Sequence, residues 1–242
     1  MVARAGTVIG LAMGVAASAL SAQDFLADGL VVSRHQVLLS SQISGQVVTF
    51  PLRPGEAFAE GDLLAEIDCA VLRAEITAAE KSQAAAQARF DTIARLDRAG
   101  AAPKGELRVT QAQAEGAEAE AEALRQQERH CTITAPFDGR VVDLESAAYA
   151  SVRSGDGLLT VLDDRNLEIE LIVPSIWLKW LEPGSAFRFQ IFETEQVMDL
   201  TVSRVGAAID PVSRTIKIRA SIPEVPAGVL AGMTGRAAFS GP

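Results

Sequence analysis

The sequence predicts a mainly β protein into which a long α-helical hairpin is inserted. Residues 70–130 are rich in Ala, Glu, Gln and Arg, whereas both flanks carry short alternating strands separated by Gly and Pro turns. The two flanks also resemble each other. Each has a Gly, one further residue and a Val-Val pair, followed by a Gly-Asp turn and by Leu-Leu shortly before an Asp. An internal repeat that is divided by helices predicts one β unit with the hairpin inserted between its halves.

The first 22 residues predict a secretory signal peptide. Arg4 precedes an apolar stretch from Val8 to Leu20, and small residues lead to a cleavage site near Ala22. The stretch is short and rich in Gly and Ala for a membrane span, but its retention as an N-terminal anchor stays open. Export would place the two cysteines of the chain in an oxidising compartment.

Composition excludes some classes of function. The 242 residues are 48% hydrophobic, which is enough for a sizeable core. The chain has 22 Lys and Arg against 31 Asp and Glu, and its net charge of -9 repels phosphate backbones. We therefore expect no nucleic-acid partner.

Two heptad ladders predict the hairpin. Apolar and small residues recur at every third or fourth position, so each ladder would face the other helix. The ladders are Leu72, Ile76, Ala79, Gln83, Ala86, Phe90 and Ile93, and then Leu107, Thr110, Ala114, Ala117, Ala121, Leu124 and Glu128. Between them, the stretch from Ala99 to Gly105 holds the Gly and Pro residues of a turn. The other faces are mostly polar, so we expect an arm about 40 Å long that projects from the body.

The C-terminal region predicts a second β unit. Strands are expected at residues 167–173, 187–192, 198–205, 215–222 and 236–239, with a short helix at 175–181. Trp177 and Trp180 in that helix are expected to pack in a core or at its rim rather than to bind a ligand.

Three separated motifs, in order over most of residues 30–240, carry a family resemblance. They are Ser44-Gly45-Gln46-Val47 with the turn at 60–64 and Asp68; the strand entry from Ala135 to Val141; and the turn from Asp210 to Thr215 with Leu230-Ala231-Gly232-Met233. Together with the hairpin, they resemble the periplasmic adaptors of bacterial efflux and secretion pumps, which are HlyD-like membrane fusion proteins. The resemblance implies a lipoyl-like β-sandwich, split by an antiparallel coiled coil and followed by a β-barrel.

The resemblance also implies the division of the chain. The expected parts are a signal peptide at 1–22, an N-terminal segment at 23–39 that contributes to the barrel, a lipoyl-like domain at 40–68 and 132–163, the helical hairpin at 69–131, and the barrel domain at 164–242. The membrane-proximal domain that the family usually places after the barrel is not evident.

As a function, the resemblance implies a non-catalytic scaffold that couples an inner-membrane transporter, of the RND or ABC type, to an outer-membrane duct protein. It implies a place in the periplasm, association with the inner membrane through the partner, and a homo-oligomer within the complex. The alternatives are a lipoyl- or biotinyl-type carrier and a periplasmic interaction module that is not tied to efflux.

The hairpin tip is the expected partner contact, formed by Arg95, Leu96, Gly100, Ala101, Ala102 and Pro103. Many adaptors that dock on the duct carry an Arg, a Leu four residues later and a Ser seven residues beyond that. Alignment on the turn keeps Leu96 but places Thr92 at the Arg position and Pro103 at the Ser position. Arg89 and Arg95 lie nearby as possible substitutes for the missing Arg.

Several motif residues are expected to be structural. Gly139 is expected to supply a turn conformation that is costly for other residues, and Arg214 to pair with Asp210 across their turn. The full set is Gly45, Gly61, Asp68, Pro136, Gly139, Asp210, Arg214 and Gly232.

The only two cysteines, Cys69 and Cys131, are expected to form a disulfide. Cys69 opens the first helix and Cys131 closes the second, so an antiparallel hairpin brings both to its base. One further step along the two ladders, beyond Leu72 and Glu128, places them opposite each other. Two buried, reduced thiols are the alternative.

Catalytic, metal and cofactor sites are not expected. The chain has two histidines, and His130 beside Cys131 lacks a third group that would orient it. No cluster of His or Met suggests a metal. A lipoyl carrier would need a lysine just after Asp68, where this sequence has Cys69 and Ala70. We therefore expect neither lipoate nor biotin.

Overall fold

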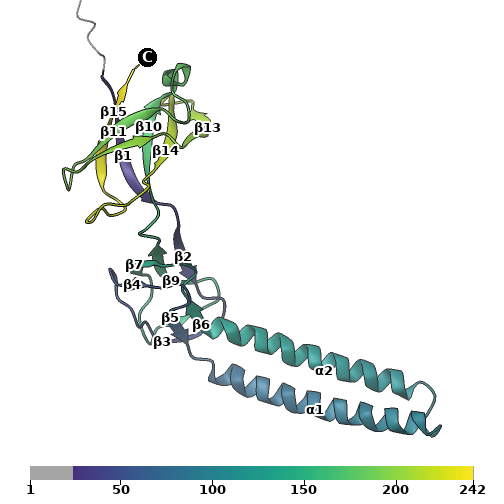
Figure 1. Cartoon of the computed structure of the whole chain (residues 1–242). Coiled ribbons are helices and arrows are strands. Elements are labelled where there is room, and N and C mark those ends of the chain that lie inside the picture. Colours follow the sequence, from purple (N-terminus) through teal and green to yellow (C-terminus); the bar gives the residue numbers. More distant parts are fainter. Residues whose placement is uncertain (1–23, 242) are drawn as a thin grey trace, which may run out of the picture.

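Three bodies follow one another along the molecule: a β-barrel, a β-sandwich and a helical hairpin (Figure 1). The structure is a computed structural model that describes residues 24–241. The predicted signal peptide therefore lies outside the described residues. Within that range no helix is both long enough and apolar enough to cross a membrane.

The barrel is built on one seven-stranded antiparallel sheet in the order β12-β11-β15-β1-β10-β14-β13. Alternate residues of most of its strands point inward, and Phe189, Phe239, Ile169, Leu171 and Ile218 are among the fully buried side chains. The strands are β1 (Asp24–Ser33), β10 (Leu167–Pro174), β11 (Ala186–Ile191), β12 (Val197–Thr201), β13 (Arg204–Asp210), β14 (Thr215–Ser221) and β15 (Thr234–Ser240). The short helix expected at 175–181 is the 3-10 helix η2 (Ser175–Lys179).

The expectation of a single strand at 198–205 is wrong. The chain ends β12 at Thr201 and begins β13 at Arg204, and these two strands lie at opposite edges of the sheet. Between them, the Val202 N–H donates to the Ser185 carbonyl at 2.9 Å and the Ser203 N–H to the Arg219 carbonyl at 2.8 Å. The crossing brings the two edges together. Buried and exposed residues go on alternating past the end of β12, as far as Ser203, so the sequence pattern does not mark the end of the strand at Thr201.

The sandwich consists of two four-stranded sheets, ordered β2-β9-β7-β4 and β6-β5-β3-β8. The two halves of the internal repeat have equivalent places. In the first half, β3 and β5 lie in one sheet and the short strand β4 lies at the edge of the other. In the second half, β7 and β9 share a sheet and the short strand β8 lies at the edge of the other. The strands are β2 (Gln36–Ser40), β3 (Gly45–Thr49), β4 (Ala57–Phe58), β5 (Leu63–Ile67), β6 (Thr132–Thr134), β7 (Gly139–Leu144), β8 (Ser151–Val152) and β9 (Gly157–Leu162).

The described part of the N-terminal segment, residues 24–39, contributes to both β bodies. β1 pairs with β10 and β15 in the barrel, whereas β2 pairs with β9 in the sandwich, with Val37 opposite Val161 and Leu39 opposite Leu159. The sandwich therefore begins at Gln36 rather than at residue 40. Two segments of the chain, β1 to β2 and β9 to β10, pass side by side between the bodies.

The hairpin leaves the sandwich between β5 and β6. Its helices are α1 (Ala70–Arg98) and α2 (Glu106–Glu128), followed by the single 3-10 turn η1 (Arg129–Cys131). Figure 1 shows that the two helices run antiparallel and project away from the sandwich, so that the turn between them lies far from the barrel.

Candidate functional site

The seam of the hairpin follows the two predicted ladders. Every residue of both ladders is buried or half-buried, while most other helical positions are exposed. The best buried ladder positions are small or short: Thr110 and Ala121 are 0% exposed and Ala114 is 6% exposed. The Thr110 hydroxyl is satisfied within its own helix, since it donates to the Glu106 carbonyl at 3.0 Å. Such a seam permits close helix approach but buries little apolar area per layer.

Ion pairs between the helices add to the seam. Arg73 Nε lies 3.3 Å from Glu128 Oε1 near the base, Arg125 lies 3.4 Å from Glu80, and Arg89 lies 2.9 Å from Glu106 near the tip. All of these side chains are at least 30% exposed, and exposed pairs stabilise by at most about 1 kcal/mol each. The pairs set the register of the helices more than they hold them together.

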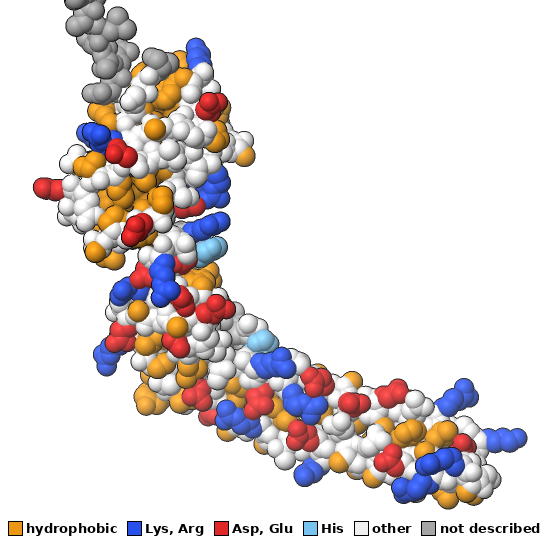
Figure 2. All heavy atoms as spheres, viewed as in Figure 1, with side chains coloured by type: hydrophobic (Ala, Val, Ile, Leu, Met, Phe, Trp, Pro, Cys, Tyr) orange, Lys and Arg blue, Asp and Glu red, His pale blue; other side chains and the backbone are white. Residues whose placement is uncertain are grey.

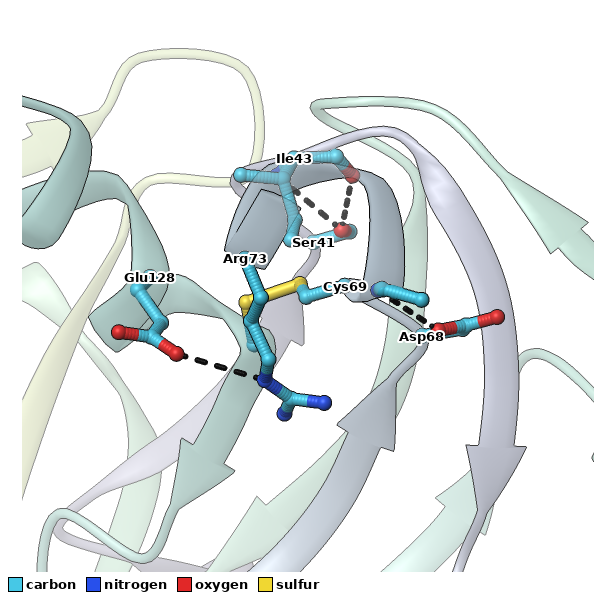
Figure 3. Close-up of a disulfide and its surroundings, with 8 residues drawn as sticks. Ser41, Ile43, Asp68, Cys69, Arg73 and Glu128 are labelled. Carbon is cyan, nitrogen blue, oxygen red and sulfur yellow. Dashed lines mark hydrogen bonds and ion pairs between the residues drawn. A yellow bond between two sulfur atoms is a disulfide. The ribbon is translucent and has the colours of Figure 1, made fainter. Parts of the chain in front are cut away.

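A disulfide joins Cys69 and Cys131 at the base of the hairpin, as the sequence predicts. The Cα atoms are 6.1 Å apart, and both residues are almost completely buried, at 3% and 1% exposure. Figure 3 shows the bond where α1 leaves the sandwich, with the Arg73–Glu128 pair beside it and Asp68 on the other side. The Asp68 carboxylate accepts the Ala70 N–H at 2.9 Å at the start of α1. The base is thus fastened covalently and by polar contacts.

The same bond removes a chemical alternative. Because the Cys131 sulfur is bonded to Cys69, it is not a thiol that the neighbouring His130 could activate. The position where a carrier domain would expose a modified lysine is occupied by Cys69 and the first turn of α1.

The tip is a short turn from Ala99 to Gly105. Gly100 and Gly105 have φ values of 72° and 84°, a conformation that other residues adopt at a cost. The Leu96 carbonyl accepts the Ala99 and Ala101 N–H groups at 3.1 and 2.9 Å, which ends α1. The Leu96 side chain is 41% exposed, and among the other tip residues Ala102 is half-buried and Pro103 exposed.

Arg89 and Arg95 are the two candidates to replace the missing tip Arg. Arg89 is engaged in the ion pair with Glu106, whereas the exposed Arg95 guanidinium donates to the Thr92 hydroxyl at 3.1 Å. Of the two, Arg95 is therefore the one that is not held by an acidic side chain within residues 24–241.

The expected ion pair between Asp210 and Arg214 is wrong. The Asp210 carboxylate accepts the N–H groups of Val212 and Ser213, both at 2.9 Å, and these bonds, that of Ser213 first, hold its pKa below the ordinary value. Arg214 has φ 55°, and its carbonyl accepts the Ser175 N–H at 2.9 Å. The short Asp210 side chain thus closes the turn by binding backbone N–H groups. The Arg214 side chain is not needed to close it.

The structure agrees that a larger residue at position 139 would be costly, but the expected reason, a turn conformation, is wrong. Gly139 is not in the left-handed region; instead, a Cβ there would lie 2.1 Å from the Leu162 carbonyl oxygen. Gly45 is likewise confined, because a Cβ would lie 2.6 Å from Ile67 Cγ2. Gly61 and Gly232 do need positive φ, at 88° and 94°.

Pro136 belongs to a junction between the two half-repeats. The preceding residue, Ala135, accepts the Gly61 N–H and donates to the Asp62 carbonyl, both at 2.9 Å. The Asp138 carboxylate accepts the Glu60 N–H at 2.8 Å. The Gly-Asp turn of the first half is therefore hydrogen-bonded to the segment that enters the first strand of the second half, just after the chain leaves the hairpin.

The joint between the sandwich and the barrel contains a residue that sequence reasoning missed. Asp163 is 5% exposed, and its carboxylate accepts the backbone N–H groups of Arg165 and Asn166 at 2.9 and 3.0 Å and the Asn166 side-chain amide at 2.7 Å. The Ser33 hydroxyl donates to the Asp163 carbonyl at 2.7 Å, which links the two crossing segments. The sequence did contain a signal for this residue, because Asp163 ends the second half-repeat as Asp68 ends the first.

The two tryptophans pack as expected. Trp177 is 7% exposed, and its ring lies 5.4 Å from that of Phe25, 5.6 Å from Phe239 and 5.5 Å from Trp180. This aromatic cluster closes the end of the barrel that lies away from the sandwich.

Comparison with known families identifies the central part of the chain. The family model for the barrel-sandwich hybrid domain of RND MFP, the RND membrane fusion proteins, matches residues 35–164. That range covers the sandwich together with the inserted hairpin.

Individual relatives agree with this match. The chain is 30% identical over 162 residues to the multidrug resistance protein MdtA of Pectobacterium atrosepticum, covering 60% of this chain and 39% of that protein. It is 25% identical over 215 residues to MdtA of Pectobacterium carotovorum, covering 79% of this chain and 52% of that protein. The chain spans between 39% and 55% of the length of the curated relatives it matches.

Solved structures show the same fold. A MacA-MexA chimeric protein that contains the Pseudomonas aeruginosa MexA α-hairpin domain matches with a TM-score of 0.83 at 22% identity, covering 91% of this chain and 79% of that chain. The predicted fold class, mainly β with an inserted helical hairpin, is confirmed.

Proposed function

The chain belongs to the RND membrane fusion protein family, and from this we propose that it is a periplasmic adaptor that couples an inner-membrane transporter to an outer-membrane duct. In this role it is a scaffold and not an enzyme. The observation that carries the proposal is the projecting hairpin, whose base is fastened by the Cys69–Cys131 bond and whose tip exposes Leu96.

The arrangement of the three bodies supports a spacer role. The chain enters β1 at Asp24, at the end of the barrel that is remote from the sandwich, whereas the turn of the hairpin lies at the opposite end of the molecule (Figure 1). An exported chain whose N-terminal part lies near the inner membrane would therefore direct the hairpin tip away from that membrane.

The partners follow from the family. We assign the transporter to the RND type, because the matching model describes RND membrane fusion proteins. The barrel end near Trp177 is the proposed transporter side, and the tip formed by Arg95, Leu96 and residues 100–103 is the proposed duct side. The adaptor is proposed to work as a homo-oligomer around the transporter, as the family resemblance implies. The largely polar faces of the hairpin give little drive for self-association alone, so assembly should need the transporter.

Photocrosslinking in cells of the native host tests the duct contact. A photoreactive amino acid at Ala102 should yield an adduct with an outer-membrane duct protein. Leu96→Asp should lower the adduct yield about tenfold, since it places a charge in an apolar contact. Val71→Asp, which changes another exposed aliphatic residue at the base of the same helix, is the matched control and should leave the yield unchanged.

Thermal unfolding separates docking from folding. Leu96→Asp should keep the melting temperature of the unaltered chain, whereas Leu124→Asp in the seam should lower it. If Leu96→Asp lowered the melting temperature as much as Leu124→Asp does, Leu96 would close the coiled coil rather than bind a partner. An unaltered chain that forms adducts with no outer-membrane protein would contradict the adaptor role.

A further inference from the structure

Charge is distributed unevenly along the hairpin. At residues 89–108, around the turn, five basic side chains accompany three acidic ones, whereas residues 69–88 and 109–131 carry seven acidic and four basic side chains. Figure 2 shows Lys and Arg side chains gathered at the far end of the hairpin, with acidic side chains frequent along the shaft. The turn is therefore the net positive end of an otherwise negative arm.

Most of this positive charge is not neutralised within the part of the chain that the structure describes. Of the five basic residues, Arg89 pairs with Glu106. The other four, Arg95, Arg98, Lys104 and Arg108, are exposed, and none of them forms an ion pair with another residue in the range 24–241. We call these four residues the basic tip. The Arg98 guanidinium only donates to the Ala94 carbonyl of its own helix, at 3.2 Å.

Two exposed aliphatic side chains accompany the basic tip. Leu96 is 41% exposed and Val109 is 50% exposed, one on each helix near the turn. A surface that combines unpaired cations with a few aliphatic side chains is suited to a partner with carboxylates around a small apolar contact.

We infer that the basic tip binds an acidic protein surface on the outer-membrane partner, an inference that rests on the adaptor role proposed above. Charge complementarity then guides the approach of the tip, and Leu96 and Val109 supply the short-range contact. Opposite charges act over about 8 Å at physiological ionic strength, so they orient the two proteins before contact. Like-charged tips repel, which disfavours pairing of free chains through this end.

The composition of the tip favours a protein over an anionic lipid surface. Binding at a lipid interface needs a broad apolar face, and the tip offers two aliphatic side chains. Asp91 and Asp97 also lie among the basic residues, and a phosphate-rich surface would repel them. A protein surface of mixed charge can accommodate both signs.

The test is a charge reversal with a matched control. The double variant Arg98→Glu with Lys104→Glu reverses two charges of the basic tip. The control, Lys81→Glu with Arg129→Glu, reverses two exposed basic residues outside the tip that also lack an ion pair within the described range. Both variants change the net charge equally, so any non-specific effect of charge is shared between them.

The readout is the adduct formed by the photoreactive residue at Ala102, measured in permeabilised cells at low and high salt. The tip variant should lower the yield about tenfold at low salt, and the control by less than twofold. For the unaltered chain, high salt should lower the yield, whereas the tip variant should have lost most of this salt dependence. Mass spectrometry of the adduct should place the contact beside Asp or Glu residues of the duct, and their replacement by Lys should restore binding of the tip variant.

Each failure has a separate meaning. An adduct with the duct that is equally strong in the tip variant and the control would overturn the acidic partner surface and leave the adaptor role standing. Adducts with lipopolysaccharide instead of protein would overturn the protein partner. A chain that gives no adduct at the outer membrane, in any variant or salt, would overturn the adaptor role and this inference with it.

Discussion

Asp68 and Asp163 occupy the same position of the two half-repeats, and each carboxylate accepts the backbone N–H two residues later, Ala70 at 2.9 Å and Arg165 at 2.9 Å. The first begins the path into the hairpin, and the second begins the path into the barrel. The repeat thus uses the same hydrogen bond, from a backbone N–H to an Asp carboxylate two residues earlier, at both exits from the sandwich. The environments differ, because Asp68 is exposed and Asp163 is 5% exposed with a second backbone donor and a side-chain donor from Asn166.

Asp163→Ala should lower the free energy of unfolding by about 1–3 kcal/mol, because it removes the charged acceptor of three partly buried hydrogen bonds. Asp199→Ala is a matched control, since Asp199 is 82% exposed in a pair with Arg188 and should cost less than about 0.5 kcal/mol. Denaturant unfolding measures both. Small-angle scattering should show a wider range of angles between barrel and sandwich in Asp163→Ala alone; equal behaviour of the two variants would contradict a role in the joint.

Acid should weaken the same joint. Burial raises the pKa of Asp163, but hydrogen bonds from the Asn166 side chain and from the Arg165 and Asn166 N–H groups outweigh it and hold the pKa below the ordinary 3.8. A lowered folded pKa contributes stability that is present above the unfolded pKa and is lost as the pH falls through the folded value. The stability difference between the unaltered chain and Asp163→Asn should therefore shrink as the pH falls below about 3.8. A difference that stays constant over this range would contradict the assignment.

Some of this architecture could be predicted because local pattern and tertiary structure agree. The two ladders identify the buried side of both helices, and the same periodicity places Cys69 opposite Cys131. The divided repeat predicts one sandwich because each half needs the other to cover its apolar face.

Other parts could not be predicted, because they depend on neighbours that are distant in the sequence. The alternation of buried and exposed residues runs past the end of β12 to Ser203, and the hydrogen bonds to Ser185 and Arg219 show where the chain crosses between strands. The confinement of Gly139 depends on the approach of Leu162. The charge of the tip was visible in the sequence, but the engagement of Arg89 by Glu106 required the folded hairpin.

Removal of the disulfide should loosen the hairpin. Its ends are 62 residues apart in the sequence, and closure of such a loop stabilises by about 4 kcal/mol on the chain-entropy model, with smaller gains common in practice. The double variant Cys69→Ala with Cys131→Ala should therefore unfold at lower denaturant concentration, and hydrogen exchange should rise most in α1 and α2, whose seam is thin. Non-reducing peptide mapping of the exported protein checks the bond itself, and two thiols that alkylate freely in the folded protein would refute it.

Gly139→Ala should destabilise the sandwich because β7 and β9 approach each other too closely for a methyl group. The new Cβ would lie 2.1 Å from the Leu162 carbonyl oxygen and 3.0 Å from its carbon, and both are backbone atoms that cannot turn aside. Overpacking of this kind costs about 1–3 kcal/mol. Gly116→Ala is the matched control, because Gly116 lies inside α2 and a Cβ there meets no atom within 4 Å. That change should instead raise the free energy of unfolding by about 1 kcal/mol, since Ala favours a helix interior over Gly. Denaturant unfolding of both variants should give shifts of opposite sign, and a Gly139→Ala protein as stable as the unaltered chain would show that the two strands have room to separate.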